Sequence, residues 1–141
     1  PPELVNAYRR FGADIGVAFQ LRDDLLGVFG DPDITGKPAG DDLREGKRTL
    51  LVAVAVERAE QQGRDDARRS ILDAVGDPAL DDDGVERVRG LFTELGAVQA
   101  VEQRIAALTG SALDALSAAD VAEPAASQLA ELAVTATRRR S

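Results

Sequence analysis

The sequence contains no cysteine and no histidine among its 141 residues. Without cysteine there is no disulfide framework, no thiolate nucleophile and no zinc–thiolate centre, which is compatible with a reducing cytoplasm, where we expect the protein. Without histidine, the commonest general base and the commonest transition-metal ligand are missing. Any chemistry must therefore be carried by carboxylates, amines, hydroxyls and amides.

Aromatic residues are also scarce, and the 17 basic residues are outnumbered by 25 acidic ones. Aromatics make up 4% of the chain and apolar residues 44%, so the core must be built from Ala, Leu, Val and Ile, which is a helix-rich composition. The length suits about one domain with a single core. A net charge of -8 argues against a general nucleic-acid binder, whose phosphate contacts need a basic surface. No apolar run approaches the roughly 18 to 20 residues of a membrane span, and the N-terminal sequence lacks a signal-peptide core, so we expect a soluble protein.

Apolar residues recur at three- and four-residue spacing through most of the chain, which is typical of amphipathic helices. We predict an all-α fold with helices at Leu4–Gly27, Arg48–Gln62, Asp65–Val75, Val85–Leu95, Ala97–Leu116 and Ala125–Arg138. The interval Gly30–Gly46 is predicted to be a loop, because glycines and prolines interrupt any period there. A loop of this length is usually functional or disordered.

The pattern also predicts some details of packing. The segment Leu50–Val56 is so apolar that we expect its helix to be buried on most sides. Ile71 and Leu72 are expected to face inward. The acidic run Asp81–Asp83 is interpreted as the start of a helix, where carboxylates favour the positive end of the helix dipole, in preference to a metal site.

The first predicted helix contains Gly12, Gly16 and Gly27, each of which weakens a helix by about 1 kcal/mol relative to alanine. Close approach of another helix or of a ligand would explain such a cost. At Gly12 and Gly16 we expect a tight helix crossing.

Charged residues gather in the stretch from Phe19 to Thr49. It contains the acidic residues Asp23, Asp24, Asp31, Asp33, Asp41 and Asp42 together with the basic residues Lys37, Lys47 and Arg48. This mixture suits a divalent metal together with a polyphosphate, because carboxylates hold the metal, the metal holds the phosphates, and lysines neutralise the remaining charge.

Helical spacing places Gln20, Asp23 and Asp24 toward one side, with Phe19 beside them as an apolar wall. Adjacent carboxylates near a helix end repel each other and the negative helix terminus unless a cation is present. Mg²⁺ is the natural candidate, because it takes one or two protein carboxylates, keeps several waters and binds substrate phosphates. From the spacing alone, two exposed aspartates that close a helix before a turn remain the alternative.

Two known motifs resemble parts of this stretch but do not fit it. GDPDITGK is similar to a phosphate-binding P-loop, yet five residues separate Gly30 from Gly36 where the motif has four, and Pro38 stands where Ser or Thr should bind the metal. DPDITG is similar to the start of a calcium-binding EF-hand loop. Its twelfth position would be Asp42, which is shorter than the usual bidentate Glu, and Pro38 would take the usual apolar eighth position.

The segment GVAFQLRDDLLGVFGDPDITGKPAGDDLREGKRTLL closely resembles the second aspartate-rich region of the trans-isoprenyl diphosphate synthases, or polyprenyl synthetases. These all-α prenyltransferases condense isopentenyl diphosphate with an allylic diphosphate. The resemblance covers about 35 residues and combines FQ, DD, GK, GDDL and EGKRT in the family order. It predicts a magnesium-dependent enzyme similar to geranylgeranyl or farnesyl diphosphate synthases.

The resemblance also implies metal ligands. Asp23 and Asp24 match the first two aspartates of the DDxxD motif, with Asp23 the more direct Mg²⁺ ligand, and Asp42 matches an aspartate that holds metal-bound waters. Gly27 is a departure, because it stands where many members have the third aspartate.

Substrate contacts follow from the same resemblance. Lys37 matches the lysine that contacts the allylic diphosphate and helps it leave, and Lys47 matches a second lysine facing the phosphates. Phe19 and Gln20 match the FQ pair beside the reacting allylic chain. Among these, Lys37, Gln20 and Lys47 are the candidate catalytic residues.

The resemblance finally implies that other parts of the enzyme are missing. The chain matches only the C-terminal portion of a polyprenyl synthetase domain, without the first aspartate-rich motif and the basic cluster that receives isopentenyl diphosphate. We therefore expect the chain to be inactive alone, to share about three Mg²⁺ ions with the N-terminal half, and to form a homodimer or associate with that half. A non-catalytic diphosphate-binding or partner subunit of the same fold is the alternative.

Overall fold

The computed structural model describes residues 2–119 and 122–138, and this part of the chain is built from helices and their connections, with no strand. The all-α prediction is therefore confirmed. The described residues form two compact units, and the division between them falls inside helix α1 (Pro2–Phe29) and helix α7 (Ala97–Ala118).

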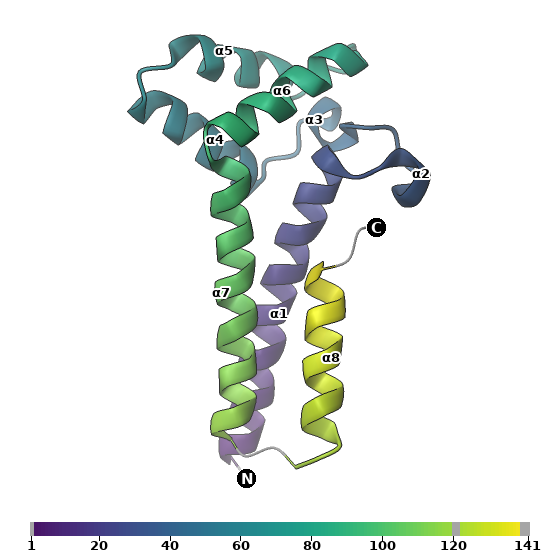
Figure 1. The fold of residues 1–141 in the computed structure, drawn as a ribbon, viewed down its shortest axis with the longest axis vertical. Coiled ribbons are helices and arrows are strands. Elements are labelled where there is room, and N and C mark those ends of the chain that lie inside the picture. The colour runs from purple at the N-terminus through teal and green to yellow at the C-terminus, as the bar shows by residue number, and fades with distance from the viewer. Residues whose placement is uncertain (1, 120–121, 139–141) are drawn as a thin grey trace. The chain divides into compact units, whose positions relative to one another are not determined.

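The first unit holds α1 as far as Arg22, α7 from Glu102 onward, and α8 (Ala125–Arg138). These three helical segments lie side by side (Figure 1). Their core is built from the buried residues Phe11, Ala112, Leu116 and Ala133, with Ile15, Leu113 and Leu129 partly buried against it. Alanines at half of the buried positions allow the helices to approach closely, as the low aromatic content of the sequence requires.

One arginine links all three segments of this unit. The Arg22 side chain is 16% exposed, and it donates a bidentate pair of hydrogen bonds to Glu102 on α7 at 2.6 and 2.8 Å. Its Nε also donates to the Thr137 carbonyl oxygen on α8 at 2.6 Å. The planar guanidinium group therefore connects α1 with two other helices at once.

The second unit contains the end of α1, followed by α2 (Pro32–Thr35), α3 (Asp41–Glu45), α4 (Leu50–Gln61), α5 (Asp65–Ala74), α6 (Asp82–Glu94) and the start of α7. Helices α4, α5 and α6 contact one another (Figure 1). Their fully buried side chains include Leu51, Ile71, Val88 and Phe92. This helical layer supports the loop that carries Lys37 and Asp42 of the predicted site.

The predicted loop Gly30–Gly46 contains two short helices that the sequence pattern did not indicate. Asp31 caps the first, because its Oδ1 accepts a hydrogen bond from the Asp33 amide at 2.9 Å and Pro32 fits the first helical position. The second, α3, lies between Gly40 and Gly46, whose φ angles of 73° and 75° are in the left-handed region that favours glycine.

The other predicted helices are confirmed, with ends that differ by a few residues. The acidic run Asp81–Asp83 does begin a helix, since the Asp81 carboxylate accepts a hydrogen bond from the Gly84 amide at 2.8 Å and caps α6. In the described residues, no helix is both long enough and apolar enough to cross a membrane.

Three packing predictions were wrong. Helix α4 is buried along one face only, at every fourth residue from Leu51, and Leu50 is 40% exposed, because the contacts of α4 are mainly with α5 and α6. Leu72 is 43% exposed although its neighbour Ile71 is buried, since adjacent residues on a helix point about 100° apart. Gly12 and Gly16 have open space where a Cβ atom would lie, so no tight crossing explains them in the described residues.

Candidate magnesium and diphosphate site

The end of helix α1 carries the two adjacent aspartates of the predicted site. Asp24 is buried, with its side chain 8% exposed, whereas the Asp23 side chain is 46% exposed. Burial of a carboxylate is costly unless it is paired and hydrogen-bonded. The alternative of two exposed aspartates closing a helix is therefore wrong for Asp24.

Helix α3 brings a third carboxylate to the same place. Asp42 lies in the first turn of α3, and its side chain is 12% exposed. Its neighbour Leu43 is buried, and the Leu43 carbonyl oxygen accepts a hydrogen bond from the Gly76 amide at 2.7 Å. Gly40 packs so closely against Val85 of α6 that a Cβ atom there would lie 2.7 Å from the valine methyl groups. These contacts fix α3, and with it Asp42, on the helical layer.

Lys47 lies among the three carboxylates. Its Nζ is 3.1 Å from Asp24 Oδ1, 3.5 Å from Asp42 Oδ2 and 3.9 Å from Asp23 Oδ2. The turn after α3 places it there, because the Lys47 amide donates to the Asp42 carbonyl oxygen at 3.1 Å. One ammonium group thus forms ion pairs with two buried carboxylates and one half-exposed carboxylate. We refer to Asp23, Asp24, Asp42 and Lys47 as the carboxylate–lysine cluster.

The cluster changes the protonation equilibrium of its lysine. Partial burial by itself lowers the pKa of Lys47. The hydrogen bond to Asp24 and the negative charges of Asp42, Asp24 and Asp23 act in the opposite direction, and the pKa of Lys47 is raised above its ordinary value as a result. Lys47 is therefore a stable cation at neutral pH.

The other predicted site residues are Lys37, Phe19 and Gln20. Lys37 is exposed on the segment between α2 and α3, where its backbone amide donates to Thr35 Oγ1 at 3.3 Å. Phe19 and Gln20 are exposed on α1, in the part of that helix that belongs to the first unit. The structure brings together Asp23, Asp24, Asp42 and Lys47, and it does not bring Lys37 to them.

Two arginines that were not predicted from the sequence donate hydrogen bonds to backbone carbonyl groups near α1 and α3. Arg44 of α3 donates to the Leu80 carbonyl oxygen at 2.7 Å and to the Ala39 carbonyl oxygen at 2.6 Å. Arg89 of α6 donates to the carbonyl oxygen of Val28, in the last turn of α1, at 2.6 Å, and lies over the Phe29 ring. No basic residue of α1 occupies its own last turn, so Arg89 supplies the cation that a helix C-terminus favours. Because the acceptors are backbone carbonyl groups, the identity of the acceptor residue does not matter, and the sequence could not predict these contacts.

The donor set fits a divalent cation by its chemistry. Carboxylate oxygens are the ligands that Mg²⁺ prefers, and the three aspartates already surround a cation, the Lys47 ammonium group. Within the described residues, no three acidic side chains are placed to bind one metal ion directly. An ion held here by one or two of these carboxylates would complete its coordination with water and phosphate oxygens.

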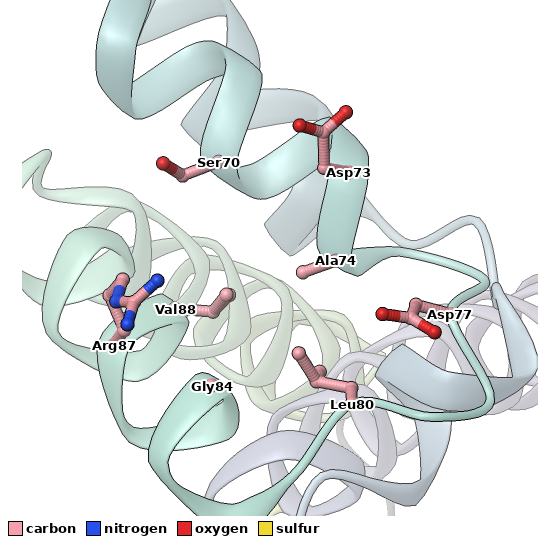
Figure 2. A pocket seen from close by; sticks show the side chains of 8 residues that line it. All are labelled: Ser70, Asp73, Ala74, Asp77, Leu80, Gly84, Arg87 and Val88. Atoms are coloured by element: carbon pink, nitrogen blue, oxygen red, sulfur yellow. The ribbon is translucent and has the colours of Figure 1, made fainter.

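A separate open cleft of about 200 Å³ lies between α5 and α6 (Figure 2). Figure 2 shows Asp73, Asp77 and Arg87 around it, with the apolar side chains of Leu80 and Val88. It contains none of the predicted site residues, and its net negative charge does not suit a diphosphate.

The chain is similar in sequence to known isoprenyl diphosphate synthases. A sequence model described as polyprenyl synthetase matches residues 1–87. The chain is 40% identical over 130 residues to the geranylfarnesyl diphosphate synthase of Aeropyrum pernix, a match that covers 92% of this chain and 38% of that protein. It is 36% identical over 122 residues to a geranylgeranyl diphosphate synthase of Mycobacterium tuberculosis, covering 83% of this chain and 33% of that protein.

Solved structures agree in fold. The geranylgeranyl pyrophosphate synthase of Corynebacterium glutamicum, complexed with isoprenyl diphosphate and magnesium, superposes with a TM-score of 0.91 at 48% sequence identity, over 99% of this chain and 39% of that chain. The geranylgeranyl pyrophosphate synthetase of Pyrococcus horikoshii gives a TM-score of 0.84 at 28% identity, over 99% of this chain and 40% of that chain.

An all-helical fold with a carboxylate–lysine cluster at the end of a long helix defines a class of protein, the isoprenyl-synthase-type helical proteins. Within that class, the chain belongs to the polyprenyl synthetase family. It spans about a third to two fifths of the length of the relatives that it matches.

Proposed function

We propose that this chain forms the C-terminal, magnesium- and diphosphate-binding portion of a trans-isoprenyl diphosphate synthase. The observation that carries the proposal is the position of Lys47 within 4 Å of Asp23, Asp24 and Asp42. A structural scaffold gains nothing from burying two carboxylates around one ammonium group, whereas a site for Mg²⁺ and phosphate needs both signs of charge. The reaction is the condensation of isopentenyl diphosphate with an allylic diphosphate.

In this proposal the residues of α1 and α3 hold the metal ions. Asp23 and Asp24 bind Mg²⁺, and Asp42 holds waters bound to it. When present, the Mg²⁺ ions, about three in the complete site, stabilise the negative charge that develops on the departing diphosphate. The rigid attachment of α3 to the helical layer keeps the Asp42 carboxylate in place without reorganisation.

The basic residues bind the leaving group. Lys47 starts beside the carboxylates, so a diphosphate that arrives with Mg²⁺ offers its ammonium group new anionic partners at short range. Lys37 lies on an exposed segment, from which its long side chain can reach the same diphosphate. Phe19 and Gln20 would lie beside the allylic chain, where an apolar wall protects the carbocation from water.

The proposal includes a missing partner. The relatives are about two and a half times as long as this chain, and Leu50 of α4 is 40% exposed. Val17 and Phe19 on α1 are also exposed. Such surfaces in one chain favour association with a second copy or with the N-terminal portion of a synthase.

A chimaeric enzyme tests the proposal. In the Corynebacterium glutamicum synthase, the matching segment would be replaced by this chain, which is 48% identical to it. We expect Mg²⁺-dependent condensation of isopentenyl and geranyl diphosphates by the chimaera and none by the isolated chain. Asp23→Ala should lower the chimaera's turnover about a hundredfold or more, because a metal ligand is lost, with the helical circular dichroism unchanged.

Two results would contradict the proposal. One is turnover by a monodisperse sample of the isolated chain, which would show that no further portion is needed. The other is a folded, active chimaera whose turnover is not changed by the Asp23→Ala substitution. A chimaera that binds diphosphate and Mg²⁺ but does not turn over would favour the alternative, a non-catalytic subunit.

A further inference from the structure

The Lys47 ammonium group shares its anionic partners with any metal ion that binds to the cluster. Its Nζ atom is 3.1 Å from Asp24 Oδ1 and 3.5 Å from Asp42 Oδ2, on side chains that are 8% and 12% exposed. A Mg²⁺ ion on the same Asp24 oxygen, at about 2.1 Å, would lie within roughly 5 Å of this ammonium group. Solvent screens little of the repulsion between two cations at a partly buried position. The ammonium group and Mg²⁺ therefore compete for these carboxylates.

Lys47 can move, whereas its partners are held. Asp24 lies within α1, and Asp42 lies in the first turn of α3, which is attached to the helical layer. The Lys47 backbone is held by its hydrogen bond to the Asp42 carbonyl oxygen, but its side chain is 36% exposed and has a flexible four-carbon stem. The ammonium group can therefore turn toward solvent or toward a bound anion while the carboxylates stay in place.

A diphosphate changes the outcome of this competition. Its oxygens accept charge-assisted hydrogen bonds, so the Lys47 ammonium group can exchange carboxylate partners for phosphate partners without losing its ionic contacts. The Asp24 and Asp42 carboxylates are then available to the metal. Mg²⁺ alone offers no such exchange, because an ammonium group that it displaces gains no new anion.

We propose that Lys47 makes the binding of Mg²⁺ depend on diphosphate, because its ammonium group competes with the metal for Asp24 and Asp42 until a diphosphate accepts it. The inference rests on the proposed magnesium and diphosphate site and adds a regulation of that site. Coupling between two ligands is reciprocal, so Lys47 makes the binding of diphosphate depend on Mg²⁺ to the same degree. The site then fills with metal and diphosphate together.

Two calorimetric titrations test the inference, one with Mg²⁺ alone and one with inorganic diphosphate in excess Mg²⁺. Lys47→Gln should tighten the binding of Mg²⁺ alone about tenfold, because the competing cation is gone. The same substitution should weaken the binding of diphosphate about tenfold, because a charged partner of the phosphate oxygens is lost. The opposite directions distinguish competition from a structural role, since a distorted site would bind both ligands more weakly.

Arg48→Gln is the matched control. It changes the net charge by the same amount at the next position, but Arg48 is exposed, so its charge is screened by solvent. We expect it to change either affinity by less than about twofold. Lys47→Arg keeps a cation at the cluster and should leave the affinity for Mg²⁺ alone close to that of the wild type.

A second measurement uses the wild-type chain and does not depend on the folding of a variant. Lys37 and Lys47 are the only two lysines in the sequence, so ¹³C labelling of lysine gives two side-chain signals for nuclear magnetic resonance, which Lys37→Gln assigns. The Lys47 signal should shift when Mg²⁺ and diphosphate are added together. The same concentration of Mg²⁺ alone should leave it nearly unchanged.

The outcomes separate this inference from the proposed function. The inference is overturned if Lys47→Gln leaves the affinity for Mg²⁺ alone unchanged or lowers it, if Arg48→Gln raises that affinity equally, or if Mg²⁺ alone shifts the Lys47 signal fully. The proposed site still stands in these cases, provided that the wild type binds diphosphate in excess Mg²⁺. A wild-type chain that binds no diphosphate under that condition overturns the proposed site itself.

Discussion

At the scale of single residues, the site combines buried carboxylates with one ammonium group that pairs with them. Asp24 and Asp42 are two of the three buried polar or charged residues in the described part of the chain, and both lie within 3.5 Å of the Lys47 ammonium group. The third, Thr137, satisfies its hydroxyl on the Ala133 carbonyl oxygen. Burial of a carboxylate is costly unless it is paired, so the Lys47 ammonium group, which pairs with both Asp24 and Asp42, contributes to the stability of the cluster.

Removal of this ammonium group should therefore destabilise the chain in a pH-dependent way. In metal-free buffer we expect Lys47→Gln to lower the free energy of unfolding by about 1 kcal/mol at neutral pH. The pKa of Lys47 is higher in the folded chain than in the unfolded chain, so its contribution is fully present below the unfolded pKa and is lost as the pH rises through the folded pKa. The difference between the wild type and Lys47→Gln should shrink at a pH above that raised value.

Urea unfolding at the two pH values measures this difference, and Lys37→Gln is the matched control, because Lys37 is exposed. The control should change the free energy of unfolding by less than about 0.5 kcal/mol at either pH. An equal loss in both variants, or a Lys47 effect that persists undiminished in alkaline solution, would show that the cluster does not depend on this charge.

At the scale of elements, helix ends are held by arginines from other helices. Arg89 of α6 donates to a carbonyl oxygen in the last turn of α1. Arg44 of α3 donates to the Ala39 carbonyl oxygen before its own helix and to the Leu80 carbonyl oxygen between α5 and α6. Arg22 performs the equivalent role in the first unit, where it connects α1 with α7 and α8. The contacts of Arg89 and Arg44 fix α1 and α3, which carry the carboxylates of the cluster.

Arg22 and Arg10 allow this role to be tested on one helix. Arg22→Ala should lower the free energy of unfolding by about 2 kcal/mol, because it removes charged hydrogen bonds to Glu102 and Thr137 from a largely buried position. Arg10 is 66% exposed, with a 4.0 Å pair to Asp14, so Arg10→Ala should cost less than about 0.5 kcal/mol. Chemical denaturation compares the two, and equal losses would contradict a structural role for Arg22.

The sequence predicted the helices well because their apolar period is local information. Helix α8 begins and ends at the predicted residues. The short helix α2 was missed, since its stability comes from one Asp31 cap and one proline within a stretch that otherwise breaks helices. The exposure of Leu50 and Leu72 could not be predicted, because a pattern shows which residues are apolar and does not show what covers them.

For the site, the sequence predicted which residues lie together but not how they pack. The family resemblance identified Asp23, Asp24, Asp42 and Lys47 as members of one site, and they do lie together, although their roles remain proposals. The packing of Gly27 against Asp42 joins two residues 15 positions apart on different helices. Neither helical spacing nor the family motif predicts that contact, because it depends on how α3 is attached to the helical layer.

At the scale of the whole molecule, the described residues contain the carboxylate–lysine cluster, and the chain belongs to a family whose members, among the relatives compared, are about two and a half times as long. The proposed function divides accordingly into a part that this chain can perform and a part that needs a partner. Binding of Mg²⁺ and diphosphate belongs to the first part, because the cluster lies wholly within the described residues of the second unit. Condensation belongs to the second part.

The most direct test is therefore a calorimetric titration of inorganic diphosphate into the chain, with and without Mg²⁺. We predict saturable binding that requires Mg²⁺, is weakened at least about tenfold by Asp42→Asn, and is unchanged by Asp41→Asn, which alters the neighbouring carboxylate outside the cluster. Binding that is equally tight without Mg²⁺, or equally affected by the two substitutions, would contradict the claim that the carboxylate–lysine cluster is a magnesium diphosphate site.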